Sequence, residues 1–146
     1  MAAVSRLILI SALSLQLSAC AAIGGRSLTS NGSRAELSSA AADAIAGDMV
    51  SRLAEHVGPG KATIALKADD SVFGRALEAS LRRWGYAVAT DQKTDQRAIA
   101  LAYVLDTYDG TVLARLSTPQ FDLGRAYAVT ASGATPSSPL SVLERG

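Results

Sequence analysis

The sequence is short of the residues on which most catalytic and metal sites depend. It has a single cysteine, Cys20, and a single histidine, His56. One cysteine cannot form an internal disulfide, and one histidine cannot complete a catalytic triad or a zinc site. The stretch GPGK at 58–61 is a turn rather than a phosphate loop, because Ala62 stands where such a loop needs Ser or Thr. We therefore expect no enzyme, no metal and no cofactor, and we expect His56 on the surface.

An excess of one charge is also missing. The chain has 14 Lys and Arg against 13 Asp and Glu, and Arg6 lies in the N-terminal segment discussed next. Residues 20–146 therefore carry no net formal charge. Nucleic-acid binding depends on clustered basic side chains, so no nucleic-acid partner is expected. Beyond the N-terminus, no apolar run approaches the roughly 20 residues that span a bilayer.

The one long apolar run lies at the N-terminus and ends at the only cysteine. Arg6 supplies a positive charge, residues 7–17 (LILISALSLQL) are apolar, and the small residues Ser18 and Ala19 stand directly before Cys20. This order is typical of an export signal peptide over residues 1–19. An ordinary cleaved signal is the alternative, but it would leave a free thiol in an oxidising compartment.

Residues Leu17, Ser18, Ala19 and Cys20 resemble the lipobox of bacterial lipoproteins. The resemblance implies cleavage before Cys20, a diacylglycerol on its thiol and an acyl chain such as palmitate on the new N-terminus. Two or more acyl chains hold a protein firmly on a membrane. Ala21 stands where an aspartate would resemble an inner-membrane retention signal. The implied location is the periplasmic face of the outer membrane.

Composition divides the remaining chain into three parts. Residues 20–36 are rich in Gly, Ser and Asn and predict a lipidated flexible tether with a reach of roughly 20 Å. Residues 37–130 are long enough for one small core and predict a single domain. Residues 131–146 contain two prolines and few apolar side chains, and predict a loose C-terminal tail.

Two helices are expected in the domain. The first spans residues 37–57, where apolar residues recur every fourth position until GPG stops the pattern. The second should begin after Asp69 or Asp70, one of which would cap it, and should end at Gly85. Its apolar stripe is formed by Phe73, Leu77, Leu81 and Trp84.

The other expected elements are strands. Residues 61–68, 86–90 and 121–129 fit short strands, with Gly124 as a candidate bulge in the last. Residues 98–117 fit a hairpin around the favoured turn Asp109-Gly110. That turn sets Tyr103 opposite Leu116, Leu105 opposite Ala114, and Thr107 opposite Val112. The fold class is α+β, with a small, mostly antiparallel sheet and two helices packed on one face.

The hairpin also predicts what lies on the opposite face of the sheet. Asp106 and Arg115 are diagonal neighbours there, among small alanines. Edge strands of such a sheet, or the tail, can pair with a partner by strand addition.

The chain resembles the TrbH family of conjugal transfer lipoproteins from about residue 42 to residue 129. The resemblance rests on FGRALEASLRRWGY at 73–86, the Asp109-Gly110 turn and FDLGRAY at 121–127. The family belongs to the mating-pair formation apparatus of plasmid transfer, a type IV secretion system. It implies a structural or assembly subunit that contacts other channel subunits of the envelope, and it brings no catalytic residues.

A second hypothesis is an envelope-maintenance or surface-exclusion lipoprotein that binds peptidoglycan or a small ligand. Arg75, Arg82 and Arg83 would supply its basic groups. The same helix has no matching aspartate, so the sequence favours the first hypothesis.

Overall fold

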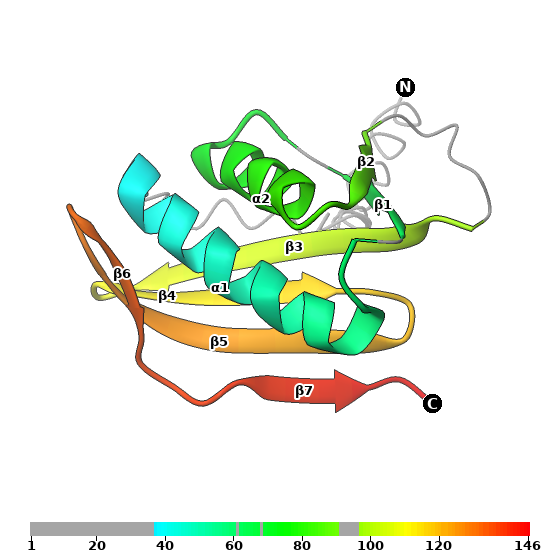
Figure 1. Cartoon of the computed structure of the whole chain (residues 1–146). Coiled ribbons are helices and arrows are strands. Elements are labelled where there is room, and N and C mark those ends of the chain that lie inside the picture. Colours follow the sequence, from blue (N-terminus) through cyan, green and yellow to red (C-terminus); the bar gives the residue numbers. More distant parts are fainter. Residues whose placement is uncertain (1–36, 61, 68, 91–96) are drawn as a thin grey trace, which may run out of the picture. The chain divides into compact units, whose positions relative to one another are not determined.

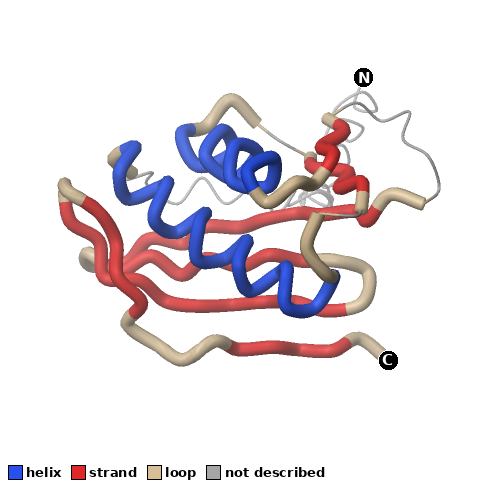
Figure 2. The backbone as a smooth tube through the Cα atoms, in the orientation of Figure 1, coloured by secondary structure: helices blue, strands red, loops and turns tan. Residues whose placement is uncertain are grey.

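A computed structural model describes residues 37–60, 62–67, 69–90 and 97–146 (Figure 1). The expected signal peptide, lipobox and tether lie outside these residues. Two helices and seven strands are described, and Figure 2 shows them by type. In chain order they are α1 (Ser39–Val57), β1 (Thr63–Leu66), α2 (Val72–Arg83), β2 (Ala87–Ala89), β3 (Ile99–Tyr108), β4 (Thr111–Ser117), β5 (Phe121–Thr130), β6 (Gly133–Pro136) and β7 (Ser141–Glu144).

The described strands form one sheet in the order β2-β1-β3-β4-β5-β6, with β7 also paired to β5. β1 runs parallel to both β2 and β3, because α2 carries the chain back between β1 and β2. The remaining pairs, from β3 through β5 to β6 and β7, are antiparallel. The expected α+β fold with a mostly antiparallel sheet is confirmed.

Both helices lie on the same face of the sheet (Figures 1 and 2). The predicted stripe of α1 is buried, with Ile45, Met49 and Leu53 fully inaccessible. It packs in one core with alternating residues of β4 and β5, such as Leu116 and Leu123. Alternation along these strands leaves every second side chain on the face that no described helix covers. We call this the helix-free face.

The start of α2 differs from the expectation. Neither Asp69 nor Asp70 is the N-cap; Ser71 is, and its Oγ accepts a hydrogen bond from the Gly74 amide at 2.9 Å. Asp69 Oδ1 instead accepts from the Ser71 amide at 3.1 Å and from the Tyr103 hydroxyl at 2.5 Å. A serine and an aspartate are about equally good caps, and the bond to Tyr103 directs Asp69 toward β3.

The end of α2 shows a second difference. Trp84 was expected in the core, but it follows the last helical residue and is 41% exposed. The three earlier stripe residues, Phe73, Leu77 and Leu81, are buried as predicted. Gly85 ends the helix with φ 87°, a conformation that glycine adopts without strain. The helical turn that would have placed Trp84 over the core is therefore not completed.

The predicted hairpin is confirmed in its register. β3 and β4 pair Tyr103 with Leu116, Leu105 with Ala114, and Thr107 with Val112. Asp109 and Gly110 both have positive φ, 47° and 72°, as a two-residue hairpin turn requires. The bulge considered at Gly124 is absent, because the ladder between β4 and β5 runs through the Arg115–Gly124 pair without a break.

The expectation of a loose tail over residues 131–146 is wrong. β6 pairs with β5 over Tyr127 to Thr130, and β7 pairs with β5 over Phe121 to Gly124. The two short strands thus share the outer edge of β5. Without them, β5 would leave a row of backbone amides and carbonyls unpaired. The chain therefore closes this edge with its own C-terminus.

Candidate functional site

The described ranges contain no recognisable catalytic or metal centre. They hold no group of three or more His, Cys, Asp or Glu side chains that could bind a metal ion. His56 is exposed, as predicted, and its ring lies 5.0 Å from that of Phe121 between centroids. No helix among the described residues is long and apolar enough to cross a membrane.

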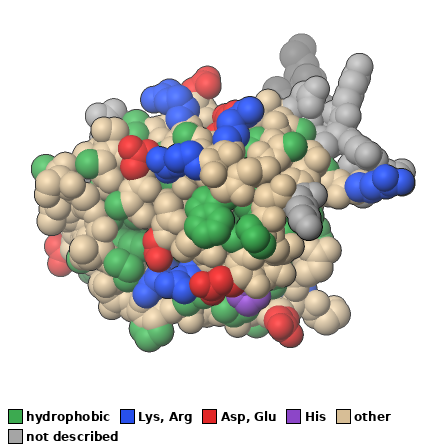
Figure 3. Space-filling model, in the orientation of Figure 1, with side chains coloured by type: hydrophobic (Ala, Val, Ile, Leu, Met, Phe, Trp, Pro, Cys, Tyr) green, Lys and Arg blue, Asp and Glu red, His purple; other side chains and the backbone are tan. Residues whose placement is uncertain are grey.

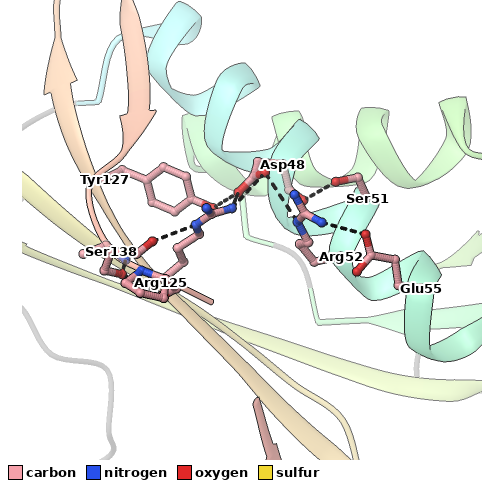
Figure 4. A network of polar contacts seen from close by, with 9 residues as sticks. Asp48, Ser51, Arg52, Glu55, Arg125, Tyr127 and Ser138 are labelled. Carbon is pink, nitrogen blue, oxygen red and sulfur yellow. Dashed lines mark hydrogen bonds and ion pairs between the residues drawn. The ribbon is translucent and has the colours of Figure 1, made fainter. Parts of the chain in front are cut away.

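A polar cluster is centred on Asp48 of α1 (Figure 4). The Tyr127 hydroxyl donates to Asp48 Oδ2 at 2.6 Å, and Arg125 Nη1 donates to the same oxygen at 2.9 Å. Arg125 Nε also donates to the backbone oxygen of Ser138 at 3.0 Å. Asp48 therefore joins α1 to β5, and Arg125 joins both to the segment between β6 and β7.

This cluster is structural. Tyr127 is only 1% exposed, and burial, followed by the hydrogen bond to Asp48, holds its pKa far above the ordinary value. Its hydroxyl is thus a permanent donor rather than a proton acceptor. This cluster was not predicted from the sequence. The sequence signal is the alternation of Leu123, Arg125 and Tyr127 on one face of β5, because an arginine largely withdrawn from water, here with a side chain 17% exposed, favours a carboxylate partner.

A second polar cluster fastens α2 to β3. The Tyr103 hydroxyl bonds to Asp69 and lies 3.4 Å from Ser71 Oγ. The Phe73 ring meets the Tyr103 ring edge-on at 5.3 Å between centroids. Gly74 allows this approach, since a Cβ there would lie 2.6 Å from the Tyr103 hydroxyl oxygen. Burial raises the pKa of Tyr103. The polar groups of this cluster bond to one another, so this cluster is structural like the first.

Part of β3 has no strand partner on one side in the described part of the chain. β1 pairs with β3 only along Ile99 to Leu101. No described strand follows on that side, so residues 102–108 of β3 border no other strand there. We call residues 102–108 the β3 edge. Its Val104 and Tyr108 side chains are 38% and 84% exposed.

Two charged side chains lie on the β3 edge or directly beside it, and one of them, Arg115, interacts electrostatically with Asp122. Asp106 and Arg115 lie on the helix-free face, as predicted, and neither makes a hydrogen bond or ion pair to a described residue. Farther along the same face, Arg145 binds Asp122 through both carboxylate oxygens, at 2.7 and 2.8 Å. That bond holds the pKa of Asp122 below its ordinary value.

Charges of both signs are mixed on the visible surface rather than gathered into a basic patch (Figure 3). The view agrees with the near-equal numbers of acidic and basic residues. It gives no footprint for a phosphate backbone.

The predicted lipidation site lies outside the described residues. Cys20 and the lipobox residues Leu17, Ser18 and Ala19 are therefore neither confirmed nor contradicted, and they stay predictions. Partner contact through sheet edges stays a prediction; the outer side of β5 is occupied by β6 and β7, and residues 102–108 of β3 are unpaired on one side among the described strands.

Comparison with known proteins gives the family. A family model described as "Conjugal transfer protein TrbH" matches residues 23–146. A protein of Sinorhizobium fredii named "Probable conjugal transfer protein TrbH" is 51% identical over 124 residues, covering 81% of this chain and 84% of the relative. No solved structure matches. The match extends through β6 and β7, so these strands are part of the family's domain. The chain therefore belongs to the TrbH family of conjugal transfer proteins, and its role is in conjugation.

Proposed function

We propose that this protein is a structural or assembly subunit of the mating-pair formation complex, a conjugative type IV secretion system. It acts by contact with other subunits of the envelope channel. Lipid on Cys20 anchors it to the periplasmic face of the outer membrane, and residues 20–36 serve as the tether. No reaction is part of this role.

The observation that carries the proposal is the open β3 edge. Native sheets usually protect long edge strands with charges, proline, bulges or a covering segment. The outer edge of β5 is covered by β6 and β7. The β3 edge has no proline and a single charge, at Asp106, and is otherwise built from alanine, β-branched, aromatic and leucine residues. Such an edge can accept an extended strand through main-chain hydrogen bonds.

Ligand binding by the basic groups of α2 has less support. The Arg75 guanidinium donates to the Asp70 backbone oxygen at 2.8 Å, and Arg82 forms an ion pair with Glu78 at 2.7 Å. Arg83 donates to Ser80 Oγ at 3.3 Å. Each of the three arginines thus has a partner in its own chain, and no specific observation favours a peptidoglycan site.

Deletion of the gene from a conjugative plasmid tests the role in the complex. We expect plasmid transfer to stop while growth of the host stays normal, and the wild-type gene supplied in trans should restore transfer. Transfer at the wild-type frequency in the deletion strain would remove the proposed function.

A matched pair of variants tests the site. Thr107→Lys places a charge at the β3 edge, where lysine opposes strand pairing. Thr135→Lys makes the same change at an exposed position of β6. Complementation by the first variant should fail and by the second should succeed, with equal amounts of both proteins in the envelope. Equal transfer in both would show that the β3 edge is not used.

A further inference from the structure

We infer that the strand received by the β3 edge is β3 of a second copy of this chain. The inference rests on the proposed function in that it names the partner of the same edge. The two β3 strands pair antiparallel about a two-fold axis at Leu105. The two sheets become one, and the helices of both copies lie on one face.

The choice of register follows from charge. Two identical antiparallel strands pair about a central residue, so each register is defined by the residue that faces its own copy. Centring on Asp106 would set two carboxylates directly opposite each other, which is destabilising. Centring on Leu105 sets an apolar pair at the axis and places Asp106 opposite Val104 of the second copy. It also uses the β3 edge from residue 102 to residue 108, just beyond the pairs with β1.

The charges on either side of the axis complement each other. Arg115 lies directly beside Val104 in the ladder between β3 and β4. In the Leu105 register, Asp106 of the second copy lies on the other side of Val104. The two Cα atoms are then two strand spacings apart, roughly 10 Å, a gap that an arginine and an aspartate side chain together span. The two-fold axis makes this contact twice, so an aspartate of one copy meets an arginine of the other on each side of the axis.

Two single charge changes test the inference. Asp106→Arg sets two arginines against each other across the axis, and Arg115→Asp sets two aspartates against each other. When the two variants are combined, both contacts across the axis regain opposite charges. The charges within each variant chain remain alike, so a contact inside one chain cannot explain recovery.

The experiment uses full-length protein with two different affinity tags, co-expressed and purified in mild detergent. Wild type should capture wild type. Each single variant should capture itself about tenfold less than wild type does, because both charge contacts across the axis change from attractive to repulsive. Asp106→Arg should capture Arg115→Asp at the wild-type level. Asp43→Arg, an exposed acidic-to-basic change on α1, should leave capture unchanged and controls for a charge change away from the β3 edge.

Self-capture by either single variant at the wild-type level, or no recovery in the mixed pair, would overturn the inference. Failure of the proposed function has a different signature. If the mixed pair of variants recovers capture but gene deletion leaves transfer unchanged, pairing with a second copy is supported and the role in transfer is refuted. If wild type does not capture itself but Thr107→Lys still stops transfer, a different protein fills the edge and the role stands.

Discussion

Asp48 shows how one side chain can fix the position of a helix on a sheet. It accepts hydrogen bonds from Tyr127 and Arg125 on β5, so α1 cannot slide along the sheet without breaking both. A hydrogen bond to a charged group is worth about 1.5–3 kcal/mol. The carboxylate therefore contributes specificity of packing as well as stability.

The unfolding free energy should fall above about pH 10, and Tyr127→Phe should lessen that fall. The pKa of Tyr127 is raised from 10.0 in the folded state, mainly by burial. Stability from a raised pKa is complete below the unfolded pKa and decreases as pH rises toward the folded one. Urea unfolding of wild type and variant at about pH 8 and pH 11 measures this. Equal pH dependence in the two proteins would contradict the assignment.

Trp84 and Leu81 should respond differently to truncation. Leu81→Ala removes a fully buried side chain and should lower the unfolding free energy by about 2–5 kcal/mol. Trp84→Ala removes a side chain that is 41% exposed, so its cost should be smaller, about 1 kcal/mol. Urea unfolding of the two variants makes the comparison. A larger loss for Trp84→Ala would mean that Trp84 belongs to the core after all.

At the scale of elements, the sequence predicts the features that depend on neighbouring residues, such as turns and hairpin register. The turn at Asp109-Gly110 fixes the register of β3 and β4, so every pair in that hairpin could be predicted from the sequence. β6 and β7 could not, because their four-residue segments contain serine, glycine and proline and have no strand pattern of their own. They are strands because the outer edge of β5 needs partners.

The candidate site could be predicted in part, because some of its features depend on local sequence and others on distant residues. The faces of Asp106 and Arg115 follow from hairpin alternation. The openness of the β3 edge does not, because it depends on β1 ending at Leu66, far away in sequence. The N-cap of α2 depended likewise on a distant residue, since Tyr103 bonds to Asp69.

β7 should be the first strand to exchange its amide hydrogens. All four of its residues are exposed, and it is fastened by the ion pair between Arg145 and Asp122. Exposed ion pairs add little stability, and regions with few buried contacts open at low free-energy cost. Hydrogen exchange should show fast exchange in residues 141–144 and slow exchange in β4. Equal protection of the two strands would contradict this prediction.

At the scale of the whole molecule, the proposed lipid on Cys20 would hold the domain at the membrane. Cys20→Ser should abolish lipidation and release the protein from the membrane fraction, because the hydroxyl does not replace the thiol as the site of lipid attachment. Cell fractionation and a labelled palmitate measure the two effects. Unchanged fractionation of the variant would refute the anchor.

The strands of the sheet differ in how far they are paired, and the proposed function rests on this difference. β6 and β7 cover the outer side of β5, whereas residues 102–108 of β3 have no strand partner on one side in the part of the chain that the structure describes.

The central claim is that this TrbH-family protein is a subunit of the transfer complex. Affinity purification of the tagged protein in mild detergent from envelopes of mating-competent cells, followed by mass spectrometry, tests it most directly. We predict recovery of outer-membrane channel components with the wild-type protein and their loss with Thr107→Lys. Recovery of cell-wall fragments alone, or of nothing reproducible, would contradict the claim.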